Sequence, residues 1–121
     1  MKDVKILAAY VSEHMDIKVD RIIHSGKTRA LETAEVMAEY LHPANIEVDR
    51  ELTPLADPLV WADRLAEMEE EIMLVGHLPH LNKLSSNLLS DDNDRRVLNF
   101  QTSGMACIEK KDGVWSIAWM I

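Results

Sequence analysis

Two short apolar runs, each followed by a glycine-containing turn and a helical pattern, constrain this fold more than any other feature. In the first, Val19, Ile22 and Ile23 are apolar and β-branched, which favours a short buried strand over Ile22–His24, and Ser25-Gly26 then ends it. From Thr28 onward apolar residues recur at helical spacing. The helix face expected to be buried holds Leu31, Ala34, Ala38 and Leu41. A strand, a tight turn and a helix direct free backbone N–H groups towards an anion.

The second run, Ile72 to Val75, is typical of a central strand covered on both faces. It ends in Gly76-His77-Leu78-Pro79, and a helix is expected from about residue 79 to 89. Ligands of open α/β sheets bind at the carboxyl ends of strands, so Arg29 and His77 are expected in one pocket. Arginine and imidazole suit a phosphoryl oxyanion. Each also has a plainer interpretation: Arg29 as a solvated helix residue, and His77 as a structural histidine bound to a backbone carbonyl.

The rest of the chain predicts the other elements of an α/β domain. They are amphipathic helices at 3–14 and from Pro58 to about Glu70, a strand at 46–48 at or near a sheet edge, and a C-terminal β-hairpin of residues 104–109 and 114–121 around a Lys110-Lys111-Asp112-Gly113 turn. Alternating strands and helices call for a mostly parallel sheet with helices on both faces. The sequence therefore predicts a three-layer α/β/α fold in a single domain, residues 1–121.

Composition limits the partners. A formal charge of −8 argues against nucleic acid or an anionic membrane as the main partner. One cysteine, Cys107, excludes an internal disulfide and fits a reducing cytoplasm. No segment approaches the roughly 18 apolar residues of a membrane span. We expect a cytoplasmic protein of ordinary globular composition.

Several motifs resemble those of one family. The stretch from His24 to Ala30, with Thr33, resembles the second-arginine motif of the histidine phosphatase superfamily, whose fold is phosphoglycerate-mutase-like, and residues 76–79 resemble its second-histidine motif. Glu51-Leu52-Thr53-Pro54 and Thr102-Ser103-Gly104 match the small SixA-type phosphohistidine phosphatases. The motifs occur in the family's order and cover nearly the whole chain.

The resemblance implies a phosphatase in which a nucleophilic histidine takes the phosphoryl group and water then removes it. Arg29 would neutralise the equatorial oxygens, His77 would donate to an oxygen as charge develops, and Ser25 would complete the cradle with nearby backbone N–H groups. The substrates it implies are phosphohistidines on proteins, including phosphotransfer domains of two-component signalling. No metal or organic cofactor is expected.

The sequence departs from the family at the nucleophile. Family members begin with a buried strand ending in Arg-His-Gly, and these 121 residues contain no Arg-His-Gly. The domain is therefore expected to be N-terminally truncated relative to the family and to hydrolyse almost nothing. His24 and His80 are poor substitutes, because neither lies where an in-line attacker is needed. We expect His80 to be exposed and His24 to lie beside the pocket wall.

Other chemistry is weakly supported. Glu51 and Asp57 are weak candidates for the general acid. A zinc site built from His24, His77 and His80 has no acidic or cysteine ligand at suitable spacing.

Loss of an interior strand would leave unpaired backbone groups on its neighbours. We expect the sheet to re-pair or to borrow an edge from a second copy, and a homodimer is the favoured outcome. Three readings stay open. The chain is a phosphatase domain lacking its nucleophile segment, a non-catalytic module that binds phosphate or a phosphorylated protein through Arg29 and His77, or an oligomerising structural domain that shares only the fold.

Overall fold

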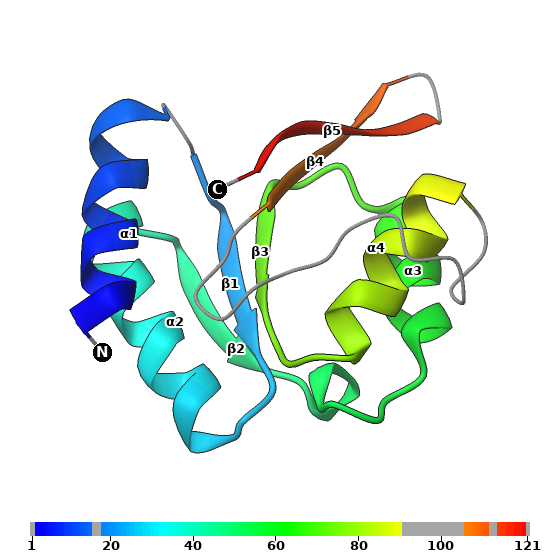
Figure 1. Cartoon of the computed structure of the whole chain (residues 1–121), viewed down its shortest axis with the longest axis horizontal. Coiled ribbons are helices and arrows are strands. Elements are labelled where there is room, and N and C mark those ends of the chain that lie inside the picture. The colour runs from blue at the N-terminus through cyan, green and yellow to red at the C-terminus, as the bar shows by residue number, and fades with distance from the viewer. Residues whose placement is uncertain (1, 16–17, 91–105, 112–113, 121) are drawn as a thin grey trace.

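The computed structural model of the chain describes residues 2–15, 18–90, 106–111 and 114–120 (Figure 1). In chain order the elements are α1 (Lys2–His14), β1 (Arg21–His24), α2 (Thr28–Leu41), β2 (Asn45–Val48), the 3-10 helix η1 (Arg50–Leu52), α3 (Pro58–Glu67), β3 (Ile72–Val75), α4 (His80–Ser90), β4 (Ala106–Lys111) and β5 (Val114–Met120). None of the described helices is both long enough and apolar enough to span a bilayer.

Strands β2, β1 and β3 form a parallel sheet in that order, with β1 in the middle. Successive side chains of a strand point to opposite faces, so Ile22 and Ile23 enter different cores. Ile22 packs with residues of α1 and α2, and Ile23 packs with residues of α3 and α4. Figure 1 shows the two helix pairs on opposite sides of the sheet. The predicted three-layer α/β/α fold is confirmed.

The first core lies between the sheet and the helices α1 and α2. Its buried members are Val4, Ala8, Val19, Ile22, Ala34, Val36 and Met37. In α1 the buried residues Val4, Ala8 and Val11 follow the predicted spacing of one helix face.

Helix α2 buries a different stripe from the expected one. Leu31 was expected inside and is exposed, whereas Ala30, Ala34 and Met37 are buried. Those three residues have the i, i+4, i+7 spacing of one face, and Leu31 lies one position to its side. The small alanines let α2 approach the sheet and α1 closely, and the larger leucine stays in solvent.

The second core lies on the other face of the sheet, against α3 and α4. It centres on Trp61 and Leu52, both almost fully buried, with Ile23, Ala62 and Leu84 around them. The apolar spacing of α4 predicts Leu81, Leu84 and Leu88 on its inward face; Leu84 is buried and Leu88 packs against this core.

Helix α3 begins as predicted and ends early. Pro58 occupies its first turn, and Asp57 Oδ1 accepts a hydrogen bond from the backbone N–H of Leu59 at 3.0 Å. The helix was expected to reach about Glu70 and ends at Glu67, because Met68 already has extended backbone angles. The residues beyond it return towards the sheet, where Glu70 contacts Arg21.

Strand β3 was expected to be central and covered on both faces; the central position is wrong for the described sheet, and the cover on its two faces is partial. Among the described strands it pairs with β1 alone, and its four residues are only half-buried. Its side chains still divide between the two cores: Met73 and Val75 face α1 and α2, and Ile72 and Leu74 face α3 and α4. Both faces are therefore covered in part, while one backbone edge has no partner among the strands that the structure describes.

The C-terminal hairpin is confirmed. Strands β4 and β5 are antiparallel, and Cys107 lies opposite Trp119. They form a separate two-stranded sheet. The expected Asp112-Gly113 turn and the Thr102-Ser103-Gly104 motif lie outside the described residues.

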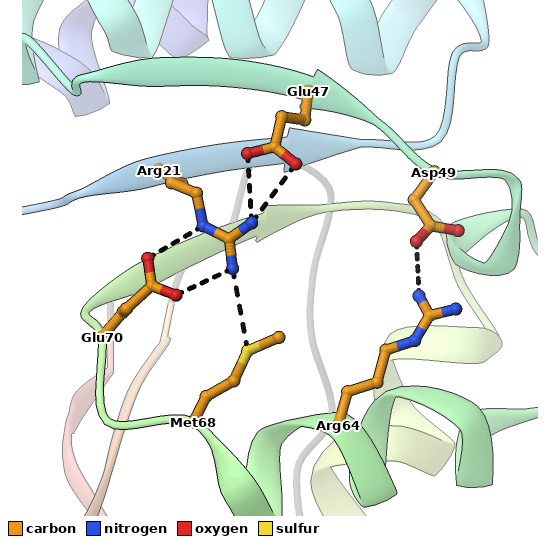
Figure 2. Close-up of polar contacts among 6 residues, drawn as sticks. All are labelled: Arg21, Glu47, Asp49, Arg64, Met68 and Glu70. Atoms are coloured by element: carbon orange, nitrogen blue, oxygen red, sulfur yellow. Dashed lines mark hydrogen bonds and ion pairs between the residues drawn. The ribbon is translucent and has the colours of Figure 1, made fainter.

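One guanidinium links three segments at the start of the sheet. Arg21 Nη1 donates to both carboxylate oxygens of Glu47 on β2, at 3.1 and 3.2 Å, and Arg21 Nη2 donates to Glu70 Oε1 at 3.1 Å (Figure 2). The hydrogen bonds to Glu47 raise the pKa of Arg21. Arg21 Nε lies 3.0 Å from the other oxygen of Glu70, so two nitrogens meet this carboxylate, and such bidentate pairs restrict geometry as well as adding energy. Arg21 thus ties β1, the edge strand β2 and the segment before β3 together.

A second ion pair joins α3 to the loop after β2. Arg64 pairs with Asp49, whose other carboxylate oxygen accepts from the N–H of Glu51 at 2.8 Å (Figure 2). Arg64 also lies 5.0 Å from the centre of the Trp61 ring. These contacts hold η1 against α3, beside the carboxyl end of the sheet.

Candidate functional site

The turns that follow β1 and β3 lie side by side. His24 and Val75, the last residues of the two strands, are partners in the sheet register. Two residues beyond Val75, the ring of His77 meets the side chain of Ser25: Ser25 Oγ and His77 Nε2 are 2.7 Å apart. Ser25 is buried and His77 is half-buried. The structure thus brings together two of the three predicted site residues.

The turn after β1 is fixed by its own backbone contacts. Gly26 has φ 89°, a conformation that L side chains rarely adopt. Its N–H donates to His24 Nδ1 at 3.1 Å, and the N–H of Lys27 donates to Ser25 Oγ at 3.3 Å. A neutral His24 ring therefore carries its proton on Nε2. His24 is buried against the turn, and the serine hydroxyl is held between the N–H of Lys27 and the ring of His77.

The turn after β3 packs against η1. A Cβ atom added at Gly76 would lie 3.0 Å from the carbonyl oxygen of Leu52. The N–H of Leu81 donates to the carbonyl of His77 at 3.0 Å, which joins the turn to α4. The Glu51-Leu52-Thr53-Pro54 segment singled out in the sequence therefore borders this turn.

Charge near the pair comes from Lys27. Burial lowers the pKa of His77, and the positive charge of Lys27 lowers that pKa further. At neutral pH the His77 ring is uncharged, so one ring nitrogen donates and the other accepts. A bound anion would favour the protonated ring. The sequence analysis assigned no role to Lys27. Its position directly after Gly26, between Ser25 and Arg29, was the signal that could have identified it as part of the site.

Arg29 has no polar contact with the pair. It sits in the first turn of α2 and is exposed. Within the described part of the chain it has no hydrogen bond or ion pair, so the structure links it by a polar contact to neither Ser25 nor His77. Its guanidinium is available to solvent or to a ligand.

His80 was expected to be exposed, and this prediction is wrong. Its exposed fraction is 0%, and neither ring nitrogen has a hydrogen-bond partner among the described residues. Burial lowers the pKa of His80, a trend that the negative charge of Asp57 opposes and the nearby His77 reinforces. An unpaired buried donor costs about 1–3 kcal/mol. The first turn of α4 packs inward against the α3 side, which turns this side chain away from solvent.

Asp57 and Glu51, the two weak candidates for the general acid, lie at the start of α3 and in the 3-10 helix η1. Asp57 caps α3 through Oδ1, and Glu51 lies in η1 with its backbone N–H bound to Asp49. Across the described ranges, no three His, Cys, Asp or Glu side chains gather closely enough to hold a metal ion.

Comparison with known proteins identifies the fold. No family model matches the sequence, and no curated protein matches it. Among solved structures, the chain is similar to the protein histidine phosphatase SixA complexed with tungstate, with a TM-score of 0.86 and 22% identity, over 99% of this chain and 78% of that one. It is also similar to a putative phosphohistidine phosphatase SixA from Agrobacterium tumefaciens, with a TM-score of 0.77 and 21% identity, over 98% of this chain and 76% of that one. This likeness is one of fold, and it confirms the expected phosphoglycerate-mutase-like architecture.

Proposed function

We propose that this domain binds the phosphoryl group of a phosphohistidine-bearing protein, with Ser25 and His77 as its central contacts. One observation carries the proposal. Ser25 Oγ and His77 Nε2 lie 2.7 Å apart at the carboxyl ends of two neighbouring parallel strands, which is where open α/β sheets bind ligands. A hydroxyl and a titratable imidazole at hydrogen-bonding distance suit the oxygens of one tetrahedral anion.

The charges around the pair support the same ligand. Lys27 and Arg29 are both exposed at the start of α2, whose first-turn N–H groups have no partner within the helix. The domain as a whole carries a formal charge of −8. The turn and helix that follow Ser25 thus carry two cations that oppose the overall field. In this proposal Arg29 swings onto the phosphoryl oxygens and His77 donates to one of them.

The similar solved structures agree with this chemistry. One of them is a SixA protein complexed with tungstate, which is a tetrahedral oxyanion like phosphate. We infer that this domain is of the SixA phosphohistidine phosphatase type and takes the same class of anion.

We further propose that these 121 residues bind the phosphoryl group without hydrolysing it. They contain no Arg-His-Gly sequence to supply the family's nucleophile. His24 and His80 are both buried, and His24 Nδ1 already accepts a hydrogen bond from Gly26. A nucleophile must come within about 3–3.5 Å of the phosphorus along the attack line. Neither ring is free to do so.

The unpaired edge of the half-buried strand β3 favours assembly of the domain with a second copy. Its outer backbone edge has no partner among the described strands, although its side chains contribute to both cores. Unpaired strand edges template pairing with another chain. We propose a homodimer in which a second copy covers this edge. An oligomerising role and phosphoryl binding are compatible, because the Ser25–His77 pair lies at the end of the strands.

A phosphate titration followed by ¹H–¹⁵N NMR tests the proposed function. Inorganic phosphate at millimolar concentration should shift the backbone signals of Ser25 and Gly26 and the ring signals of His77. His77→Ala should abolish the shift at Ser25, while the matched variant His14→Ala, which alters an exposed histidine of α1, should leave it unchanged. No shift at Ser25 or His77 would overturn the proposal and leave a structural domain.

A hydrolysis assay tests the second part. A phosphohistidine peptide incubated with the 121-residue chain should decay no faster than in buffer. Turnover that His77→Ala abolishes and metal chelation leaves untouched would show that a nucleophile is present after all.

A further inference from the structure

Ser25 lies on the turn between the middle strand of the parallel sheet and a helix. It directly follows β1, Gly26 turns the chain at φ 89°, and α2 begins at Thr28. A sharp turn of this kind, from a strand to a helix at the carboxyl edge of an α/β sheet, is where α/β hydrolases hold a nucleophilic serine. Phosphoryl binding uses the Ser25 hydroxyl only as a contact, but its position also suits a nucleophile.

The hydroxyl of Ser25 has a base within hydrogen-bonding distance. Ser25 Oγ lies 2.7 Å from His77 Nε2, which is within the range of about 2.6–3.2 Å that joins a nucleophile to its base. The N–H of Lys27 already donates to Oγ, which leaves the hydroxyl proton free to bond the imidazole. Burial and the charge of Lys27 lower the pKa of His77, so the ring is neutral at pH 7 and able to accept that proton.

Donors for a developing negative charge follow Ser25 in the chain. No side chain caps α2 at Lys27, so the N–H groups of the first turn have no partner within the helix or from its cap. The helix dipole adds positive potential at this end, and the charges of Lys27 and Arg29 are exposed there. Backbone N–H groups and cations of this kind stabilise the oxyanion of a tetrahedral intermediate.

Two features limit the substrate. Ser25 is 2% exposed, so a small acyl group can reach its hydroxyl more easily than a bulky one. Among the residues that the structure describes, no carboxylate is bonded to the ring of His77. A carboxylate in that place orients the imidazole and stabilises the imidazolium, so a pair without it needs a leaving group that departs readily.

We propose that Ser25 and His77 form a nucleophile–base pair that hydrolyses activated esters of small carboxylic acids. Ser25 Oγ bonds to the acyl carbon, His77 Nε2 takes the hydroxyl proton, and the bond from that carbon to the leaving oxygen breaks as the proton passes to this oxygen. Water then attacks the acyl carbon, His77 takes a proton from the water, the bond from carbon to Oγ breaks, and the proton returns to Oγ. The products are a phenol or alcohol and a carboxylic acid. This activity goes beyond phosphoryl binding and does not depend on it.

The ester p-nitrophenyl acetate tests the pair. The 121-residue chain should release p-nitrophenol faster than buffer does, and peptide mapping by mass spectrometry after an acid quench should find an acetyl group on Ser25. His77→Gln keeps a polar side chain beside Ser25 but removes the base, so the rate of Ser25 acetylation should fall at least about a hundredfold.

The matched controls alter a hydroxyl and an imidazole outside the pair. Ser12→Ala and His14→Ala change exposed residues of α1 and should retain the full rate. A ¹H–¹⁵N spectrum shows whether each variant is folded. Acetylation confined to lysines, or acetylation of Ser25 at an unchanged rate in a folded His77→Gln variant, would overturn the proposal.

The outcomes separate this activity from phosphoryl binding. If phosphate shifts the signals of Ser25 and His77 but Ser25 takes no acetyl group, the esterase activity is refuted and phosphoryl binding stands. If Ser25 is acetylated through His77 and phosphate shifts neither residue, phosphoryl binding fails and the esterase activity stands. Where both hold, inorganic phosphate should slow the acetylation of Ser25, because the anion occupies the same pair.

Discussion

Ser25 Oγ and His77 Nε2 are 2.7 Å apart, although 52 positions separate the two residues in the chain. The contact exists because β1 and β3 are neighbouring parallel strands whose last residues, His24 and Val75, are in register. Each strand then turns at a glycine, and both turns present a side chain at the same edge of the sheet. Most of the testable consequences concern this edge.

Removing the serine hydroxyl should weaken anion binding without unfolding the domain. Ser25→Ala deletes the bond to His77 and the acceptor used by the N–H of Lys27. A hydrogen bond of this kind contributes about 1 kcal/mol, so we expect affinity for inorganic phosphate to fall by about five- to tenfold in an NMR titration. The matched control is Ser12→Ala, which removes a hydroxyl bound to a carbonyl within α1. Equal affinity in the two variants would contradict a role for Ser25.

Binding of a dianion should depend on the protonation of His77. Burial and Lys27 hold the pKa of this ring below its ordinary value of about 6.5 in the free domain, and a bound dianion raises it. Affinity for sulfate, whose charge is constant above pH 4, should therefore rise as pH falls below the raised pKa of the complex and level off below the pKa of the free domain. His77→Gln should flatten this profile. A pH-independent affinity in the unmodified chain would argue against His77 as a donor.

The charge of Lys27 should influence the pH at which His77 is protonated. Lys27→Met removes a positive charge that lowers the pKa of His77, so the pKa measured from the ring signals should rise. Lys83→Met on α4, also exposed, serves as the charge-matched control. An unchanged pKa in the Lys27 variant would place the lysine too far from the ring to matter.

His80 should make the fold sensitive to acid. In the folded domain its pKa is lowered by burial, whereas in the unfolded chain it is about 6.5. The unfolded state therefore binds more protons below pH 6.5, and the free energy of unfolding falls from there down to the folded pKa. His80→Leu removes this dependence and an unpaired buried donor, so we expect the variant to be more stable by about 1 kcal/mol at neutral pH. Urea unfolding at several pH values, with His14→Leu as control, measures both effects.

Gly26→Ala should destabilise the turn that holds Ser25. A side chain at φ 89° is strained, and the added Cβ would lie 2.9 Å from Cγ2 of Val48. We expect a loss of about 1–3 kcal/mol in the free energy of unfolding. Adding Val48→Ala should relieve the contact but leave the backbone strain, so stability should return only in part. Full recovery would mean that contact alone sets the requirement for glycine.

Assembly is tested by sedimentation equilibrium. The unpaired edge of β3 leads us to expect a dimer of the 121-residue chain at micromolar concentration. A well-folded monomer under those conditions would contradict the expected homodimer.

The sequence determined the elements of this protein, because apolar periodicity reports which side of each segment is buried. The strands predicted at 22–24 and 72–75 are β1 and β3, Pro58 lies in the first turn of α3 as predicted, and the strands predicted on either side of Asp112-Gly113 pair as a hairpin. The order of strands and helices then left few arrangements other than a parallel sheet between helix layers. Chain order and a sheet rule together also predicted that the residues after the two strands, Arg29 and His77, share one pocket. The contact that the structure shows between the two turns is the one from Ser25 to His77.

Tertiary structure decided what depends on neighbours distant in sequence. Leu31 and Ala30 are adjacent in the helix, and only the close approach of α2 to its neighbours leaves the larger one outside. His80 is buried because the start of α4 faces the α3 side, a packing relation that the residue's polarity argued against. Strand β3 is a half-buried edge strand because, among the described strands, only β1 pairs with it. Its apolar run gives no information about how many strands lie beside it. Local pattern gives the buried face of an element, and only packing gives the partner that buries it.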